Sequence, residues 1–120
     1  MGQEWERVAE KKLKAAGYRV LERNYRTRLG ELDFVAEHKG VLCFIEVKGR
    51  RTPAFGAPEE AVTREKQRRI FRAAQAYLQR RRNADVPCRF DVVAIVETER
   101  RTDVRILRDA FQGPPPPRRR

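Results

Sequence analysis

The sequence has few of the residues that a disulfide scaffold or a zinc site would need. Its 120 residues include two cysteines and one histidine. Cys43 and Cys88 stand in apolar stretches without Cys-x-x-Cys spacing, which favours buried thiols in a reducing compartment. His38 lies in an expected turn, where a solvent-exposed side chain is the usual outcome. Four good zinc ligands cannot be assembled from this set, so no zinc centre is expected.

Long hydrophobic segments are also missing. No stretch approaches the ~18 apolar residues that a membrane helix needs. Residues 1–6 have neither the apolar centre of a signal peptide nor an arginine-rich amphipathic presequence. We therefore expect a soluble, cytoplasmic protein without a membrane partner. The length suits one domain over residues 1–112, and the Pro- and Arg-rich residues 113–120 are typical of a disordered tail.

Acidic residues are scarce beside basic ones. The chain has 28 Lys and Arg residues against 17 Asp and Glu residues, and its formal net charge is +11. Without Arg118, Arg119 and Arg120 the charge is still +8. Such a basic folded part favours a polyanionic partner, of which nucleic acid is the commonest. A bias from genome composition or heat adaptation stays open as an alternative, because 22 of the basic residues are arginines.

The spacing of apolar residues predicts an α/β domain. Helices are expected over residues 3–16 and 62–82, where apolar residues recur at helical spacing. Strands are expected over residues 18–25, 32–36, 41–48 and 90–96, with a short edge strand over 104–107. A turn at 38–40 would make a hairpin, and the second helix would be a right-handed crossover between two parallel strands. Residues 26–30 and 50–58 are expected to be links.

One pair of residues on the third strand suggests a site. The pattern acidic-x-Lys occurs three times, but only Glu46 and Lys48 fall on a predicted strand, where residues two apart share a face. If the hairpin turns about Lys39 and Gly40, paired residue numbers add up to 79 and Asp33 lies opposite Glu46. The Cβ atoms would then be roughly 5 Å apart. A bulge at Gly40 would shift this register by one residue.

Two carboxylates at that distance repel each other unless a cation or a proton lies between them. Hard oxygen ligands favour Mg²⁺, with Mn²⁺ as a substitute, and such an ion can promote phosphodiester hydrolysis. Lys48 would stabilise the transition state or orient water, and Glu6 could complete the site from the first helix. The alternative is a surface ion cluster in which Asp33 and Glu46 pair with Lys48 and Arg50.

A basic ridge is predicted along the second helix, whose basic side chains from Arg64 onward should face outward while its apolar residues pack inward. Together with arginines near the two links, it supplies the candidate nucleic-acid contacts. These are Arg28, Arg50, Arg51, Arg64, Lys66, Arg68, Arg69 and Arg72.

These motifs resemble the bacterial YraN family. The resemblance covers roughly residues 4–111 and rests on five segments in order. They are Glu6 in the first helix, Gly30-Glu31-Leu32-Asp33, Phe44-Ile45-Glu46-Val47-Lys48 with Arg50, Phe55-Gly56 with Pro58, and Arg89-Phe90-Asp91-Val92-Val93. Trp5 stands where the family usually has glycine, and Leu32 precedes Asp33 where the wider superfamily has proline.

The resemblance implies a restriction-endonuclease-like fold of the PD-(D/E)XK superfamily, similar to archaeal Holliday-junction resolvases. That fold is an α/β core with a mixed five-stranded sheet, a β-hairpin plus a β-α-β unit, flanked by two helices in the order α-β-β-β-α-β-β. It also implies metal ligation by Asp33 and Glu46, a catalytic role for Lys48 and an accessory role for Glu6.

Three functions fit these observations. The first is a Mg²⁺-dependent endonuclease acting on DNA phosphodiesters, including branched or junction DNA in repair or recombination. The second is a binding module that keeps the nuclease fold without turnover. The third is a basic RNA-binding or ribosome-associated protein, which leaves the opposed carboxylates unexplained. DNA is favoured over RNA, and resolvase-like cleavage would call for a homodimer.

Overall fold

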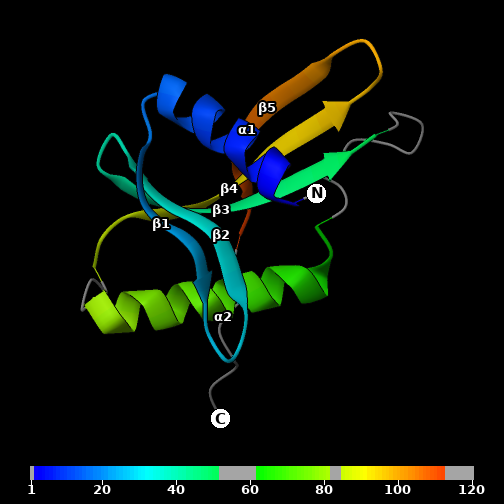
Figure 1. Ribbon diagram of the computed structural model, residues 1–120. Coiled ribbons are helices and arrows are strands. Elements are labelled where there is room, and N and C mark those ends of the chain that lie inside the picture. The colour runs from blue at the N-terminus through cyan, green and yellow to red at the C-terminus, as the bar shows by residue number, and fades with distance from the viewer. Residues whose placement is uncertain (1, 52–61, 82–84, 113–120) are drawn as a thin grey trace.

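The computed structural model describes residues 2–51, 62–81 and 85–112 and gives the order α-β-β-β-α-β-β that the sequence predicts (Figure 1). The helices are α1 (Gly2–Ala15) and α2 (Arg64–Arg81). The strands are β1 (Arg19–Arg26), β2 (Glu31–His38), β3 (Val41–Arg50), β4 (Cys88–Glu97) and β5 (Thr102–Phe111). The edge strand predicted over residues 104–107 is longer in the structure, because β5 pairs with β4 from Thr102 to Phe111.

The five strands form one mixed sheet in the order β1-β2-β3-β4-β5. Only β3 and β4 are parallel, and α2 connects them, while the other neighbours are antiparallel. In the β2–β3 hairpin, Phe34 pairs with Ile45 and His38 with Val41, so paired residue numbers add up to 79 as predicted. Lys39 and Gly40 both have positive φ and form the turn without shifting the register.

The helices cover opposite faces of the sheet (Figure 1). Under α1, Ala9 and Leu13 pack on residues such as Phe34 and Ile45. Under α2, Ile70 and Tyr77 belong to the second cluster, with Phe44 among the strand residues that they cover. No helix in the described ranges combines the length and apolarity needed to cross a membrane.

A buried polar network at the end of β2 and the start of β4 corrects the prediction for His38. This residue is 7% exposed, its ring stacks on Tyr18 with centroids 4.3 Å apart, and its Nδ1 lies 3.0 Å from a guanidinium nitrogen of Arg89. Arg89 also donates to the fully buried Asp91, which accepts a second hydrogen bond from the Tyr18 hydroxyl. A buried carboxylate such as that of Asp91 needs hydrogen-bond partners of this kind. His38 is buried because it packs against Tyr18 and Arg89, which bind that carboxylate.

The cysteine prediction holds for one thiol only. Cys43 is buried on the α1 side of the sheet, where burial raises the pKa of its thiol to about 12. Cys88 is exposed at the first position of β4 and is therefore not a buried thiol. Most of the predicted link 50–58 and the whole predicted tail 113–120 lie outside the described residues.

Candidate functional site

The site lies where β2 and β3 separate. Their backbone pairing ends at Phe34 and Ile45, yet β2 reaches back to Glu31 alongside β1, and β3 runs on to Arg50 alongside β4. Asp33 and Glu46 are the next residues of the two strands at this point. The carboxylate of Asp33 accepts a hydrogen bond of 2.7 Å from the backbone amide of Val47. A side chain thus bridges the two strands just beyond their last backbone pair.

The two carboxylates share a partly closed environment. Glu46 is 4% exposed and Asp33 is partly buried. Burial and the charge of Glu46 raise the pKa of Asp33 to about 7, although the Val47 amide acts in the opposite direction. Glu6 adds a smaller repulsion of the same sign. The two carboxylates are therefore close enough to repel each other, although Asp33 and Glu46 lie one residue beyond the last backbone pair of β2 and β3 and are not themselves a pair of the register.

Two lysines neutralise Glu46. Lys66 places its Nζ atom 2.7 Å from Glu46 Oε2, and Lys48 places its Nζ atom 4.0 Å from the same oxygen. Burial and the neighbouring Lys66 ammonium lower the pKa of Lys48. Burial also acts against the charge of Lys66, but its hydrogen bond and attraction to Glu46 outweigh this and raise its pKa.

Lys66 corrects the prediction of an entirely outward basic ridge. The sequence predicts it as a nucleic-acid contact, whereas the structure turns it toward Glu46. The sequence contained a sign that Lys66 faces the sheet. Lys66 stands four residues before the buried Ile70 and eight before the buried Ala74, on the face of α2 that packs inward. A lysine at the end of an apolar stripe is well placed to reach a carboxylate at the rim of the core.

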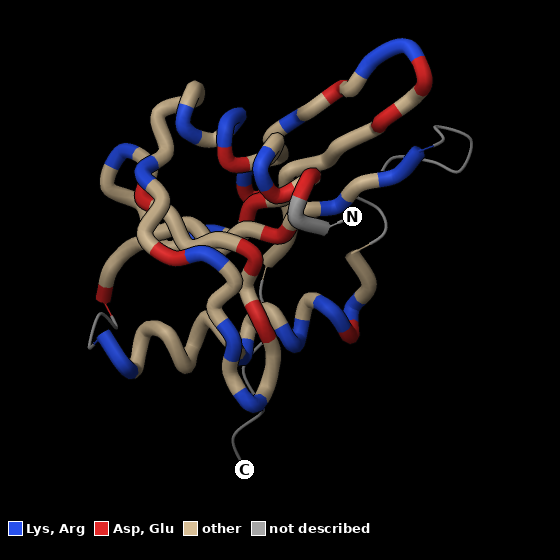
Figure 2. Tube along the Cα trace, in the orientation of Figure 1, with Lys and Arg blue, Asp and Glu red and all other residues tan. Residues whose placement is uncertain are grey.

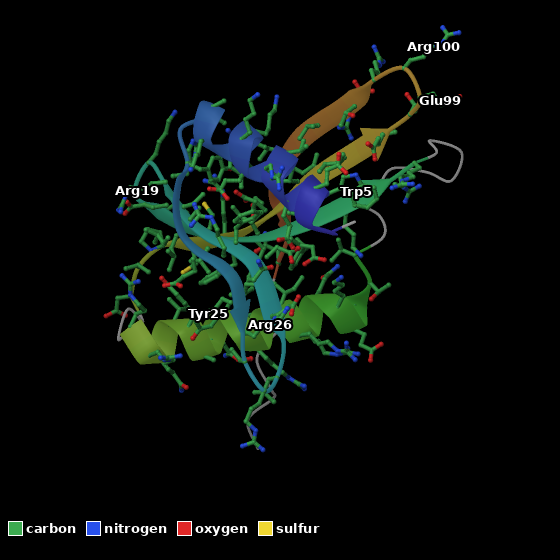
Figure 3. The ribbon with its side chains drawn as sticks, viewed as in Figure 1. Trp5, Arg19, Tyr25, Arg26, Glu99 and Arg100 are labelled. Carbon is green, nitrogen blue, oxygen red and sulfur yellow. The ribbon has the colours of Figure 1, made fainter. Side chains whose placement is uncertain are left out.

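Glu6 lies close to the carboxylate pair without joining it. It is partly buried and lines a pocket of about 250 Å³ that also touches Phe34, next to Asp33. The start of α1 is anchored by Trp5, whose ring covers the Cα of Gly49 and whose Nε1 donates to Glu97 at 3.1 Å (Figure 3). Among the described residues no three His, Cys, Asp or Glu side chains converge tightly enough to hold a metal ion.

The donor chemistry of the pair nevertheless suits a divalent cation. Asp33 and Glu46 offer carboxylate oxygens, which hard ions prefer. Burial and the charge of Glu46 raise the pKa of Asp33, and a cation between the two groups would relieve their repulsion. Two protein carboxylates leave room for further ligands from water or phosphate, which is how Mg²⁺ is usually held.

Exposed arginines extend from this site along α2. Arg64, Arg68, Arg69 and Arg72 are exposed on the helix, and Arg28 is exposed in the link between β1 and β2. Figure 2 shows basic residues on α2 and at the tip of that hairpin. Of the other candidates, Arg50 is partly buried and Arg51 places its Nε 3.8 Å from Glu97 Oε1. The helix and the hairpin tip therefore form the main basic surface beside the site.

The model of the uncharacterised protein family UPF0102 matches residues 5–95, a span that contains Asp33, Glu46, Lys48 and Lys66. The chain belongs to this family. This confirms the resemblance to YraN. A UPF0102 protein of Symbiobacterium thermophilum is 46% identical over 94% of this chain and 97% of its own length. Those of Desulfosudis oleivorans and Chlorobaculum parvum are 44% and 50% identical over 93% and 80% of this chain, and over 89% and 74% of their own lengths.

Proposed function

We propose that this UPF0102 protein is a metal-dependent endonuclease that hydrolyses phosphodiesters at Asp33, Glu46 and Lys48, with DNA favoured over RNA. The observation that carries the proposal is the pairing of two carboxylates at the point where β2 and β3 separate, with two lysine ammonium groups beside them. The exposed arginines of α2 support a polyanionic substrate.

Each residue has a separate task in this proposal. Asp33 and Glu46 would hold Mg²⁺, with Mn²⁺ as a substitute, and the ion would supply the positive charge that polarises the phosphate and acidifies a water molecule. The Val47 amide holds the Asp33 carboxylate in place. Lys48, on the same face as Glu46, stabilises negative charge that develops on the phosphate. Lys66, from α2, fixes the Glu46 carboxylate through the same oxygen that Lys48 approaches.

One observation favours a second candidate, a nucleic-acid-binding module that keeps this fold without turnover. The ion pair of 2.7 Å between Lys66 and Glu46 already neutralises one carboxylate by protein charge alone. A site stabilised in this way can persist without any cation. The two candidates differ in whether bound nucleic acid is cut.

A cleavage panel separates them. Single-stranded, duplex, flap and four-way substrates are incubated with the protein in Mg²⁺, in Mn²⁺ and in EDTA. We expect metal-dependent cleavage by the wild type, and for Lys48→Ala a rate lower by about a hundredfold or more at unchanged binding. Lys11→Ala, which removes an exposed lysine from α1, is the matched control and should cut normally.

The panel can contradict either candidate. Equal cleavage by the wild type and Lys48→Ala, after identical purification, would show that the catalytic site is wrongly assigned. A wild-type protein that binds these substrates and cuts none of them would replace the endonuclease by the binding module.

A further inference from the structure

The tip of the β1–β2 hairpin, residues 27–30, places an apolar side chain in solvent among arginines. Leu29 is 57% exposed, against 36% for Val86, the other exposed large hydrophobic residue in the described part of the chain. A single exposed leucine is common on protein surfaces and by itself indicates nothing. Its significance here depends on the rigidity of the tip, on the neighbouring charges and on its position relative to the carboxylate pair.

The tip is rigid. The Thr27 hydroxyl accepts hydrogen bonds from the amides of Leu29 and Gly30, at 3.1 and 3.0 Å, and donates one to the Gly30 carbonyl at 2.8 Å. The Thr27 amide donates to the same carbonyl at 2.8 Å. Four bonds within four residues fix the direction in which Leu29 leaves the backbone.

The tip is also anchored on α2. A Cβ atom at Gly30 would lie 2.4 Å from the Arg69 carbonyl oxygen, so only glycine allows this close backbone contact. Further up the hairpin, the ring of Tyr25 packs edge-on against Tyr77 of α2, with centroids 5.2 Å apart. Figures 1 and 3 show the hairpin reaching α2 at this point, with Tyr25 and Arg26 beside the helix. Leu29 therefore has a fixed position relative to the helix.

Positive charge surrounds the leucine. Residues 26–31 of the hairpin and Arg69 line an open pocket of about 450 Å³. Arg28 is exposed there, and Arg69 is paired with Glu65 at 3.5 Å while the side chains of both remain mostly exposed. Glu31 is the acidic residue of this group and pairs with Arg26 at 3.3 Å. Exposed pairs of this kind contribute little, so a phosphate group can replace the carboxylates.

The tip and the carboxylate pair belong to one surface. Lys66 contacts Glu46, and Arg69, three residues further along α2, contacts Gly30 of the tip. Leu29 is four residues before Asp33 in the chain, which corresponds to about 13 Å in an extended strand. Successive phosphates of one strand are separated by about 3.4 Å along a duplex axis. A nucleic acid held at Asp33 and running along β2 would thus pass Leu29 about four nucleotides away.

We propose that Leu29 is a wedge that inserts between two bases about four nucleotides from the phosphodiester held at Asp33 and Glu46, while Arg28 and Arg69 contact the flanking phosphates. Apolar side chains that enter a base step must unstack it. Nicked, flapped and branched nucleic acids have already lost stacking at one step, so the wedge selects that class over continuous duplex. This inference rests on the proposed function and specifies its substrate class.

The test measures base unstacking without cleavage. The full chain is titrated in EDTA against four-way, nicked and continuous DNA duplexes that carry 2-aminopurine at or near the discontinuity, because this base fluoresces more strongly when unstacked. The variants are Leu29→Ser, Leu29→Met as the conservative replacement, Arg28→Ala, and Val86→Ser as the matched control of an exposed apolar residue away from the tip.

We expect a several-fold rise in fluorescence at saturation on the four-way and nicked substrates with the wild type, Leu29→Met and Val86→Ser. Leu29→Ser should lose most of this rise while its affinity for continuous duplex changes less than about twofold, since phosphate contacts dominate that affinity. Arg28→Ala should lower the salt slope of binding by about one and keep the rise.

Three results would overturn the wedge while leaving the proposed function standing. The first is an unchanged fluorescence rise with Leu29→Ser, and the second is binding by the wild type without any fluorescence rise. The third is a change of molecular mass in sedimentation caused by Leu29→Ser, which would assign the leucine to a contact between copies of the chain. Absence of nucleic-acid binding by the wild type would instead refute the proposed function, and the wedge with it.

Discussion

Replacing Asp33 by asparagine should stabilise the metal-free protein at neutral and alkaline pH. The pKa of Asp33 is raised from 3.8 to about 7, first by burial and then by Glu46. A raised pKa in the folded state means that folding opposes the charged carboxylate, so the wild type loses stability as pH rises from about 4 through about 7. An asparagine side chain carries no charge and keeps an oxygen for the Val47 amide, so the Asp33→Asn variant should lack this loss.

The expected magnitude follows from the two pKa values. Their difference corresponds to about 4 kcal/mol at 1.36 kcal/mol for each pH unit. Water reaches the partly exposed carboxylate and screens part of the interaction, so we expect Asp33→Asn to be more stable than the wild type by about 2 to 3 kcal/mol above pH 7. Below about pH 4 the two proteins should have equal stability, because Asp33 is then protonated in both the folded and the unfolded wild type.

Urea unfolding in EDTA at several pH values from about 3 to 8 measures this difference. Glu10→Gln is a control of opposite sign, because hydrogen bonds from Arg23 and Lys14 lower the pKa of Glu10 to about 2. That variant should be less stable than the wild type at pH 7, and the gap should close as pH falls below about 4.5. Stability curves of the wild type and Asp33→Asn that stay parallel from pH 4 to 8 would refute the raised pKa of Asp33 in the folded protein.

Three further predictions test other parts of the structure. Titration calorimetry should detect Mg²⁺ or Mn²⁺ binding by the wild type and not by Glu46→Ala, whereas equal binding would remove Glu46 from the metal site. Replacing Arg68, Arg69 and Arg72 together by alanine should reduce the slope of log affinity for DNA against log salt by up to about three, and an unaltered slope would place the interface elsewhere. Gly30→Ala should lower the free energy of unfolding by about 1 to 3 kcal/mol, because the new Cβ would overlap the Arg69 carbonyl. If this variant were as stable in urea as the wild type, the close packing of the hairpin on α2 would be contradicted.

Much of the fold could be predicted because its signals are local. Apolar periodicity gave both helices and all five strands, and the glycine turn after Lys39 gave the register in which residue numbers add up to 79. Register and the alternation of strand faces then placed Asp33, Glu46 and Lys48 together. These quantities depend on residues within a few positions of each other in the chain, so the sequence determines them directly.

The rest depended on contacts between distant segments. The separation of β2 from β3 follows from β2 continuing with β1 while β3 continues with β4, and nothing in residues 31–50 alone specifies it. His38 is buried because Tyr18 and Arg89, 20 and 51 residues away in the chain, close over it. Docking of α2 brought Lys66 to Glu46, a position that helical periodicity allowed but could not select. The sequence by itself determined the elements, the hairpin register and the position of the two carboxylates. Only the tertiary structure decided that Lys66 of α2 meets Glu46 and that the tip of the β1–β2 hairpin lies on α2. The physical reason is that side chains from separate elements become neighbours only when the core packs.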